Sequence, residues 1–373
     1  MDMRTLRRTL SVVAAAASGL ALAATGLPAQ AATSDPLRPQ QWGLDQIKAE
    51  QAWPTSTGTG AVVAVVDSGV DLNHPDLKAN LVPGITTVGC PSGRTTCGNG
   101  DWKGMDGVGQ DNDAHGSHVS GIIAAVTNNG IGVAGTAPGA KVMPIKALED
   151  GSGSFADIAT GIRYAADHGA NVINMSIGAV PGAQALTITG VEADVDQAIA
   201  YANSKGVVVV VAAGNESVPV CDSPSFADGA ICVTSTTRNE TPSYFSNGSV
   251  KPDMKAVAAP GGEGLVSCQN DIVSTVPVGK GAAACGQSDY DYYAGTSMAT
   301  PHVAGVAALL AAQGRSRANI EAALLDTART PGVGTGAYTT AYGHGIVDAA
   351  AAVGYPGAAA VAPARTRHQG KRG

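Results

Sequence analysis

The chain has 373 residues, of which 44% are hydrophobic, 14% are charged and only 4% are aromatic. This composition excludes an intrinsically disordered protein and favours a core in which Gly- and Ala-rich helices pack closely on a sheet. The net charge of -7 argues against binding to nucleic acid or to anionic membranes, and it leaves carboxylates available for cations.

Residues 1–32 have the pattern of a secretory signal peptide: a basic start, an apolar stretch over 11–26, and the small-residue exit AQA at 29–31. A membrane anchor is the rival interpretation, but the stretch is shorter than the ~20 strongly apolar residues that span a bilayer. We expect cleavage after Ala31 or Ala32 and a secreted, extracellular protein without a membrane anchor. Paired Arg7 and Arg8 leave both Sec and twin-arginine export open.

After the signal, a short N-terminal segment (33–41) leads into a body (42–353) that contains short runs rich in β-branched residues. Runs of this kind are typical of strands buried on both faces. Helical patterns, among them 155–168 and 192–205, separate the strands, and Gly206 closes the second helix. The expected strands are 61–66, 141–147, 171–175, 207–212, 231–234, 255–258 and 271–276.

The alternation of strands and helices predicts a three-layer α/β/α fold with a mainly parallel central sheet of about seven strands and right-handed crossovers. In such sheets ligands bind outside the carboxyl ends of the strands. The tail, 354–373, is basic and rich in Ala and Pro, and we expect it to be disordered.

Two segments of this body place acid–base residues at the ends of predicted elements. Asp67 follows a fully apolar strand, where a partly buried carboxylate needs a partner. His115 and His118 stand at the opening of an apolar helix, without a third ligand or an HExxH pattern for a metal. His115 is the better candidate for a general base, and His118 is expected to be a packed structural residue. Taken alone, Asp67 could also be a helix cap or a turn residue.

Two further segments offer an oxyanion donor and a nucleophile. Asn215 ends a buried strand, where its amide could stabilise an oxyanion or simply form a turn. Ser297 begins a long apolar helix with Pro301 expected in its first turn, and a serine in that place could be a nucleophile or a cap. For each of these four residues alone, a structural role such as a cap or a turn is favoured. Four residues suited to catalysis, each at the end of a strand or the start of a helix, are hard to explain by chance.

Six cysteines, all beyond the signal, form an even set in an exported chain and lack the CxxC pairs of zinc sites. Disulfides are therefore expected. Of the fifteen connectivities that six cysteines allow, we select nearest neighbours: Cys90 with Cys97, Cys221 with Cys232, and Cys268 with Cys285.

The motifs VVDSGVDLNHPDL, HGSHVSG and GTSMATPHVAG together make the chain resemble the subtilisin family of serine peptidases, in particular its thermitase-like secreted branch. The resemblance covers roughly 42–353, so this range is expected to be one subtilisin-like catalytic domain. It implies a serine endopeptidase that works through an acyl-enzyme intermediate. Asp67 would orient His115, His115 would act as general base and then acid, Ser297 would be the nucleophile, and Asn215 would donate to the oxyanion.

By the same resemblance, a peptide substrate is expected to add as a strand between two backbone edges, 151–153 and 176–178. The first pocket then falls near Asp222 at its floor and Glu216 at its rim. Two carboxylates there would favour a basic P1 side chain, the residue before the scissile bond. An exposed acid beside the Cys221 disulfide fits Asp222 equally well. The named substrate residues are Gly151, Ser152, Gly153, Ser176, Ile177, Gly178, Glu216 and Asp222.

The segment AAVTNNGIGVAGTAP resembles the family loop that binds a structural calcium ion through oxygen atoms. Asp76 and Asn129 match the side-chain ligands, and Thr127, Ile131 and Val133 match the carbonyl ligands. A Gly/Asn turn without an ion is the alternative. A further ligand from the N-terminal segment is not evident in LRPQQWG.

Two other classes of function stay open at this stage. One is a narrow-specificity maturation protease with a basic P1 preference, and the other is a non-catalytic binding module on the same fold, which would be expected to carry a broken triad. We expect a protein or peptide substrate, no nucleic-acid partner and a monomer.

Overall fold

The central feature of the computed structural model is a seven-stranded sheet in the order β2-β3-β1-β4-β5-β6-β7. Every pairing in this sheet is parallel. The structure describes residues 33–102, 113–178, 193–251, 253–265, 267–281, 285 and 287–356. The expected signal peptide and most of the expected tail therefore lie outside the described residues.

The strands follow the apolar runs of the sequence closely, and each is buried along most or all of its length, as strands with helices on both faces should be. The seven strands of the sheet are β1 (Val62–Asp67), β2 (Ile85–Thr86), β3 (Lys141–Lys146), β4 (Val172–Met175), β5 (Val208–Ala212), β6 (Ala230–Thr236) and β7 (Ala256–Pro260).

One expected strand belongs elsewhere. The run 271–276 forms β8 (Ile272–Thr275), which pairs antiparallel with β9 (Tyr290–Tyr293) in a separate two-stranded sheet. Its place at the edge of the expected seven is taken by β2, whose two residues are too few to show a pattern. A second small sheet pairs β10 (Arg329–Thr330) with β11 (Gly334–Thr335).

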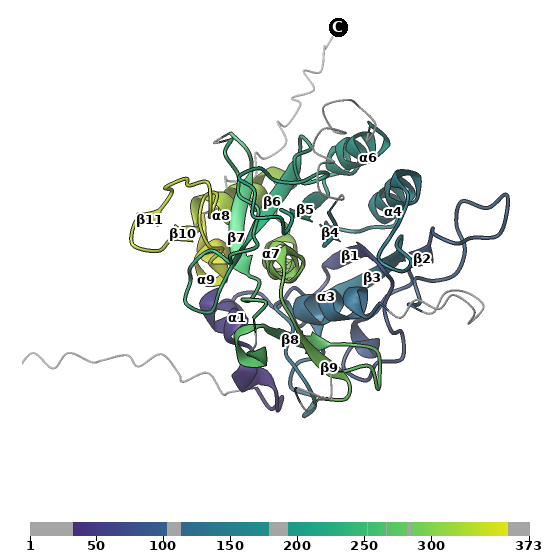
Figure 1. The fold of residues 1–373 in the computed structure, drawn as a ribbon, viewed down its shortest axis with the longest axis horizontal. Coiled ribbons are helices and arrows are strands. Elements are labelled where there is room, and N and C mark those ends of the chain that lie inside the picture. Colours follow the sequence, from purple (N-terminus) through teal and green to yellow (C-terminus); the bar gives the residue numbers. More distant parts are fainter. Residues whose placement is uncertain are drawn as a thin grey trace, which may run out of the picture. The chain divides into compact units, whose positions relative to one another are not determined.

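Two layers of helices cover the sheet, and the alternation of side chains along β1 shows it. Val63 and Val65 belong to one buried cluster, which includes residues of α3 (His115–Ala124) and α7 (Thr296–Ala311). Ala64 and Val66 belong to a second cluster, which includes residues of α4 (Phe155–Asp167) and α6 (Ala193–Ser204). The predicted α/β/α arrangement is confirmed, and Figure 1 shows α4 and α6 together, away from α3 and α7.

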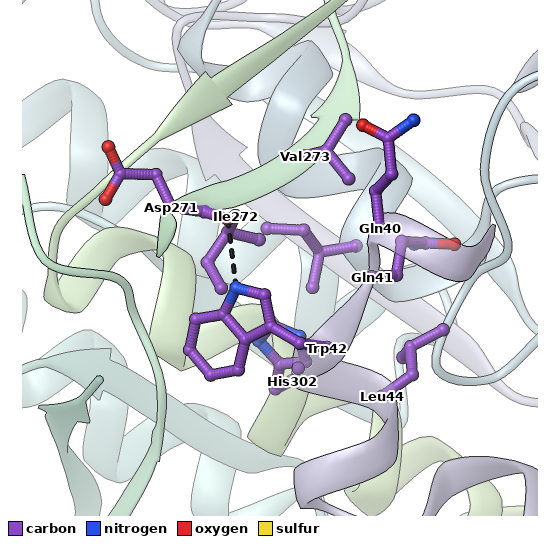
Figure 2. Close-up of a pocket in the computed structure, with 10 residues that line it drawn as sticks. Gln40, Gln41, Trp42, Leu44, Asp271, Ile272, Val273 and His302 are labelled. Atoms are coloured by element: carbon purple, nitrogen blue, oxygen red, sulfur yellow. Dashed lines mark hydrogen bonds between the residues drawn. The ribbon is translucent and has the colours of Figure 1, made fainter. Parts of the chain in front are cut away.

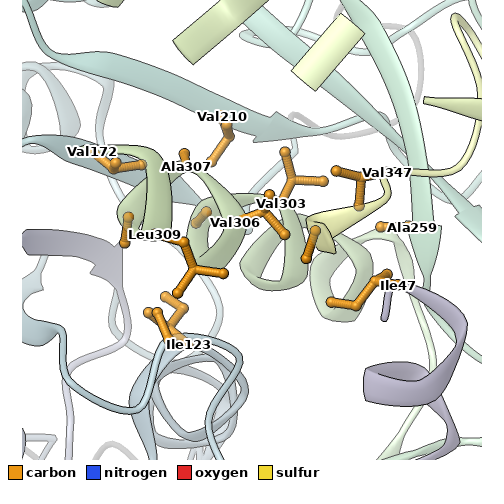
Figure 3. Close-up of a cluster of buried hydrophobic side chains, with 14 of the residues drawn as sticks. Ile47, Ile123, Val172, Val210, Ala259, Val303, Val306, Ala307, Leu309 and Val347 are labelled. Atoms are coloured by element: carbon orange, nitrogen blue, oxygen red, sulfur yellow. The ribbon is translucent and has the colours of Figure 1, made fainter. Parts of the chain in front are cut away.

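The first of these clusters is the larger, and α7 lies at its centre. Figure 3 shows Val303, Val306 and Leu309 of α7 between strand residues such as Val210 and the side chain of Ile123 from α3. Because α7 is apolar on all sides, it can be buried almost completely. Its first residues are thereby fixed at the carboxyl edge of the sheet.

The N-terminal segment and the last helices pack around the same cluster. The Trp42 indole N–H donates to the carbonyl oxygen of Asp271 at 3.2 Å, beside His302 of α7 (Figure 2). This contact anchors the start of the body to β8 and α7. The other α-helices in the described residues are α1 (Trp42–Gln46), α2 (Ala49–Ala52), α8 (Arg317–Asp326) and α9 (Ala349–Gly354).

The three predicted disulfides, Cys90–Cys97, Cys221–Cys232 and Cys268–Cys285, are all confirmed. Each closes a short segment of chain, as the choice of nearest neighbours required. None of the helices in the described part of the chain combines the length and the apolar character needed to cross a bilayer.

Candidate active site

Asp67 and His115 meet at the carboxyl edge of the sheet. Asp67 is the last residue of β1 and is fully buried, and His115 is the first residue of α3. The imidazole Nδ1 lies 2.8 Å from Asp67 Oδ1, and the backbone N–H of Ser68 donates to the same oxygen at 2.7 Å. Since a carboxylate only accepts, Nδ1 carries the proton in this pair, which leaves Nε2 of the neutral ring as an acceptor.

The start of α3 is held by side chains that satisfy its free backbone N–H groups. Asp113 Oδ1 accepts from the N–H of His115 at 2.9 Å, and Ser68 Oγ accepts from the N–H of Gly116 at 3.0 Å. These groups would otherwise lack partners at a helix N-terminus. The backbone on which the imidazole is mounted is therefore fixed at two successive residues.

Ser297, the second residue of α7, is joined to Ser176 by two reciprocal hydrogen bonds. The Ser297 hydroxyl donates to the Ser176 carbonyl at 3.1 Å, and the Ser176 hydroxyl donates to the Ser297 carbonyl at 2.8 Å. The second bond has a cause in the sequence: Pro301 has no N–H to donate to the carbonyl four residues earlier. Pro301 is the sixth residue of α7, so its expected place in the first turn is wrong.

Asn215 lies just beyond β5, and its amide has a defined orientation. Its Oδ1 accepts from the backbone N–H of Thr296 at 2.9 Å and from the Thr296 hydroxyl at 3.1 Å. A backbone N–H can only donate, so the atom that faces Thr296 must be the oxygen. The NH₂ group consequently points away from Thr296, next to the first turn of the helix that bears Ser297.

A cleft of about 390 Å³ opens beside His115. Both expected substrate edges line it: Gly151, Ser152 and Gly153 after β3, and Ser176, Ile177 and Gly178 after β4. Phe155 and Ile158 of α4 add apolar surface, and Ser223 and Pro224 also line it. The structure thus brings the two backbone edges and the imidazole into one cavity.

The two carboxylates expected at the first pocket lie in different surroundings. Asp222 is completely buried, so the interpretation as an exposed loop acid is wrong. A Cβ placed on Gly178 would lie 3.6 Å from Asp222 Oδ2, which puts this carboxylate behind the cleft wall. Glu216 Oε2 accepts from the side-chain amide of Asn247 at 2.7 Å.

His118 is a structural residue, as predicted. Its ring is fully buried and stacks on Tyr293, and its Nε2 lies 3.0 Å from the carbonyl oxygen of Ile272. Burial, aided by the nearby His115, lowers the pKa of His118 to about 3. The ring is therefore neutral at ordinary pH and takes no part in proton transfer.

The residues expected at the calcium loop lie close together. Asp76 is fully buried; its Oδ1 accepts from the Asn129 amide at 2.7 Å and its Oδ2 from the N–H of Val133 at 3.0 Å. Burial raises the pKa of Asp76 to about 6, and the charge of Asp35 adds to the rise. The Asn129 side-chain oxygen accepts from the N–H of Ile131 at 3.0 Å.

Asp35 was missed by the sequence reasoning, which looked for an N-terminal ligand only in the residues that follow it. It is 2% exposed, and its two oxygens accept from the N–H groups of Asn128 and Asn129 at 2.9 and 3.2 Å. Two buried carboxylates, Asp35 and Asp76, therefore face one loop, which fits a cation. In the sequence, the only sign of a special role for Asp35 is its position directly before Pro36.

The donor set at this loop consists of oxygen atoms. Within the described ranges no group of three or more His, Cys, Asp or Glu side chains converges as a metal cluster. A cation here would thus depend on backbone carbonyls, of which Thr127, Ile131 and Val133 are the expected suppliers. Such a mixture of carboxylate, amide and carbonyl oxygen is what calcium prefers.

Lys146 was also missed. It is the last residue of β3, pairs in register with Asp67, and is 1% exposed. Its Nζ donates to the carbonyl oxygens of Ser68 at 3.2 Å and Leu148 at 3.1 Å. It thereby ties the turn after Asp67 to the segment that lines the cleft. In the sequence, Lys146 is a polar residue near the end of the apolar run 141–147, and nothing in the pattern indicates that it is buried.

Comparison with known proteins identifies the family to which this chain is similar. Residues 58–345 match the subtilase family, peptidase family S8. Thermitase from Thermoactinomyces vulgaris is 42% identical over 318 residues, which cover 85% of this chain and 96% of thermitase. An extracellular protease from Xanthomonas campestris is 38% identical over 346 residues, 84% of this chain and 55% of that protein. A solved protease structure from Pseudoalteromonas arctica aligns with a TM-score of 0.71 at 35% identity, covering 86% of this chain and 98% of that one.

Proposed function

Because this chain belongs to the subtilase family and is a serine endopeptidase, we propose that Asp67, His115 and Ser297 are its catalytic triad and that Asn215 stabilises the oxyanion. The observation that carries the proposal is the 2.8 Å contact between His115 Nδ1 and the buried Asp67 carboxylate, beside a cleft lined by both substrate edges. The reading as a non-catalytic module on the same fold is set aside.

In the proposed mechanism each residue has one step. Asp67 holds the imidazole with Nδ1 protonated, so that Nε2 takes the proton of Ser297 as the hydroxyl attacks the peptide carbonyl. Negative charge then develops on the carbonyl oxygen, and the Asn215 NH₂ and the Ser297 N–H at the start of α7 stabilise it. His115 next delivers the proton to the leaving amine, and water repeats the sequence to release the acid.

Active-site labelling tests the nucleophile. A fluorophosphonate probe should label the wild-type protein and leave Ser297→Ala unlabelled, while turnover falls by about 10⁶, a value characteristic of subtilisin-type triads and not calculated from this geometry. Matching far-UV spectra and melting curves of the two proteins serve as the control. A folded wild-type protein that resists labelling would contradict the assignment.

Asn215 should act differently, because it only stabilises charge. Asn215→Ala should lower kcat by about 10²–10³, again a family value, with KM and labelling by the probe largely retained. Asn215→Asp is the matched variant: it keeps the acceptor toward Thr296 but loses the donor. If Asn215→Asp retained full turnover, the amide would not be the oxyanion donor.

We propose that the substrate is a protein segment that adds as an extended strand between 151–153 and 176–178. Backbone pairing of this type is largely blind to sequence, so the first pocket sets selectivity. The buried Asp222 behind Gly178 supports a basic P1 preference, as in a narrow-specificity maturation protease. Comparing Lys/Arg, Phe and Leu at P1 decides this: equal rates or an apolar preference would exclude it.

A structural calcium ion at the loop of Asp76 is supported by the two buried carboxylates and the raised pKa of Asp76. The proposed ligands are Asp35, Asp76 and Asn129 with the carbonyls of Thr127, Ile131 and Val133. Bound calcium would neutralise the paired acids. Chelation should lower the melting temperature of wild type and leave Asp76→Asn much less affected. Identical melts of wild type with and without chelator would count against the site.

We further propose that residues 42–353 form the catalytic domain and that the protein is exported through its signal peptide and acts as an extracellular monomer. Three disulfides and relatives named as extracellular proteases support export. N-terminal sequencing of the secreted protein tests the cleavage after Ala31 or Ala32.

A further inference from the structure

Three Asn-Gly pairs occur in the chain, at 99–100, 129–130 and 247–248. In such a pair the backbone nitrogen of the glycine can attack the side-chain amide carbon of the asparagine. Glycine favours this reaction because it has no side chain to shield its nitrogen and because its backbone rotates easily. The three pairs can therefore be compared by what holds the glycine N–H and the asparagine side chain.

At two of the pairs the glycine N–H is already bonded. The Gly100 N–H donates to the Thr86 hydroxyl at 3.2 Å, and the Gly248 N–H donates to the Val218 carbonyl at 2.8 Å. Asn247 is also only 1% exposed, and hydrogen bonds hold both the oxygen and the nitrogen of its amide. At both pairs the nitrogen that would attack is therefore fixed by a bond that must first break.

Gly130 differs from the other two glycines. Within the part of the chain that the structure describes, its N–H donates to no acceptor. A Cβ built on Gly130 would meet no atom of a non-neighbouring residue within 4 Å, and its φ of 80° lies in the left-handed region. Asn129 and Gly130 are both exposed. The nitrogen of Gly130 is thus open to its surroundings.

The Asn129 side chain is folded toward the residues that follow it. Its oxygen accepts from the Ile131 N–H at 3.0 Å, and the ring that this hydrogen bond closes contains the Gly130 nitrogen. A donor on this oxygen also stabilises the negative charge that develops there when the amide carbon is attacked. The nucleophile, the amide carbon and the donor therefore belong to one short turn.

We propose that Asn129 is a site of spontaneous deamidation. The Gly130 nitrogen bonds to Cγ of Asn129, the Cγ–Nδ2 bond breaks, and the amide nitrogen leaves as ammonia with the proton of the Gly130 N–H. Water then opens the cyclic imide at either carbonyl and returns a proton to the Gly130 nitrogen. One opening gives Asp, and the other gives isoaspartate, whose main chain runs through the former side-chain carbon. This inference does not depend on the peptidase assignment.

The modification would act on the loop that carries two buried carboxylates. Nδ2 of Asn129 donates to Asp76 Oδ1 at 2.7 Å, and the Asn129 N–H donates to Asp35 Oδ1 at 3.2 Å. Both products lose the Nδ2 donor and place a third carboxylate beside the other two, and isoaspartate also adds a methylene to the main chain of the loop. Like charges repel at this distance, so the aged protein should be less stable than the fresh one.

The test ages the folded Ser297→Ala protein, which cannot cleave itself, in calcium-free buffer at mildly alkaline pH and well below its melting temperature. Peptide mapping by mass spectrometry should find deamidation at Asn129 at least about tenfold faster than at Asn99 and Asn247, because those two pairs react only after local opening. In urea the three pairs should react at similar rates. An intact Asn129 in the folded protein, or equal rates at the three folded pairs, would overturn the inference.

Gly130→Asn, in the same Ser297→Ala background, is the matched variant. Asn also adopts positive φ, and the open space around Gly130 accommodates its side chain, which shields the backbone nitrogen. Deamidation of Asn129 should slow severalfold in this variant, with an unchanged far-UV spectrum, and an unchanged rate would contradict the role of the bare glycine.

The melting temperature gives a second readout. It should fall as the Ser297→Ala protein ages and stay constant in Gly130→Asn treated in the same way. Chromatography separates the Asp and isoaspartate products, which have equal mass, so the fall can be compared with the amount of each. A constant melting temperature after most of Asn129 has been converted would refute the proposed effect on the loop.

Discussion

The two helix layers on the central sheet differ in how much of each helix is buried. In α3 every residue except His115 is buried, and in α7 every residue except Ser297 and Ala311. In α4 and α6 only one face is buried, and the other faces solvent. The proposed general base and nucleophile are therefore half-buried exceptions at the starts of two otherwise buried helices.

This difference separates two tasks. A helix packed on all sides cannot shift without opening cavities in the core, so α3 and α7 can hold the proposed base and nucleophile in a fixed geometry. The amphipathic α4 has one solvated face and begins at the cleft, which Phe155 and Ile158 line. The proposed reacting groups thus lie on α3 and α7, here called the inner layer. Part of the proposed substrate wall belongs to the layer of α4 and α6, here called the outer layer.

The largest effect should come from a cavity in the inner layer. Leu309 of α7 is fully buried in the main cluster (Figure 3). Leu309→Ala should reduce the free energy of unfolding by about 2–5 kcal/mol, measured by urea denaturation of an inactivated Ser297→Ala background. KM, measured in the active background below the melting range, should stay near the wild-type value. A large change in KM with unchanged stability would reverse the proposed division.

A smaller effect should appear at acid pH, because the inner layer also buries two neutral histidines. Burial lowers the pKa of His118 to about 3 and that of His302 to about 4, whereas an unfolded histidine titrates near 6.5. Below pH 6.5 the unfolded chain binds protons that the folded protein refuses. The contribution of these two histidines to the free energy of unfolding is therefore fully present above pH 6.5. It falls as pH decreases, by up to about 1.4 kcal/mol per pH unit for each histidine.

Denaturation midpoints between pH 8 and pH 4.5 measure this slope. His118→Gln should show a shallower acid slope than wild type, whatever its stability at pH 8. His168→Gln, at the exposed end of α4, is the control for replacing a histidine outside the buried core. Equal slopes for wild type and His118→Gln would show that the buried ring does not drive acid unfolding.

The smallest effect is expected in the outer layer. Ile158 of α4 is 7% exposed and lines the cleft. Ile158→Ala should raise KM for peptides with large apolar residues several-fold, at a stability cost of about 1–2 kcal/mol because the gap opens to the cleft. Ile158→Val is the graded control. If Ile158→Ala destabilised the protein as much as Leu309→Ala, without affecting KM, the outer helix would be as purely structural as the inner one.

Much of this architecture could be predicted from sequence, because strands covered on both faces appear as unbroken apolar runs. Pattern alone shows that a segment is buried, not which strand it pairs with. This is why 271–276 was placed in the central sheet although Ile272–Thr275 pairs antiparallel with Tyr290–Tyr293. The three disulfides could be predicted because each joins the nearest cysteine in sequence.

The residues of the candidate site could be predicted from their sequence motifs, but the residues that support them could not. Asp35 and Lys146 are charged residues whose burial depends on segments distant in sequence, the loop over 126–133 for Asp35 and the turn after Asp67 for Lys146. Local patterns treat such residues as solvent-exposed. Asp222 was ambiguous for the same reason, since only the packed structure shows that the Cys221 disulfide leaves it buried.

The missing N–H of Pro301 has a mechanical consequence. The helix carbonyl that Pro301 leaves without a donor accepts from Ser176, in the segment along which substrate is expected to lie, so two hydrogen bonds tie Ser297 to Ser176. We expect these bonds to couple the displacements of the two residues, which would keep the Ser297 hydroxyl at a steady distance from a peptide bound along 176–178. Pro301, by freeing the Ser297 carbonyl, thus allows the start of α7 to be linked directly to the segment expected to bind substrate.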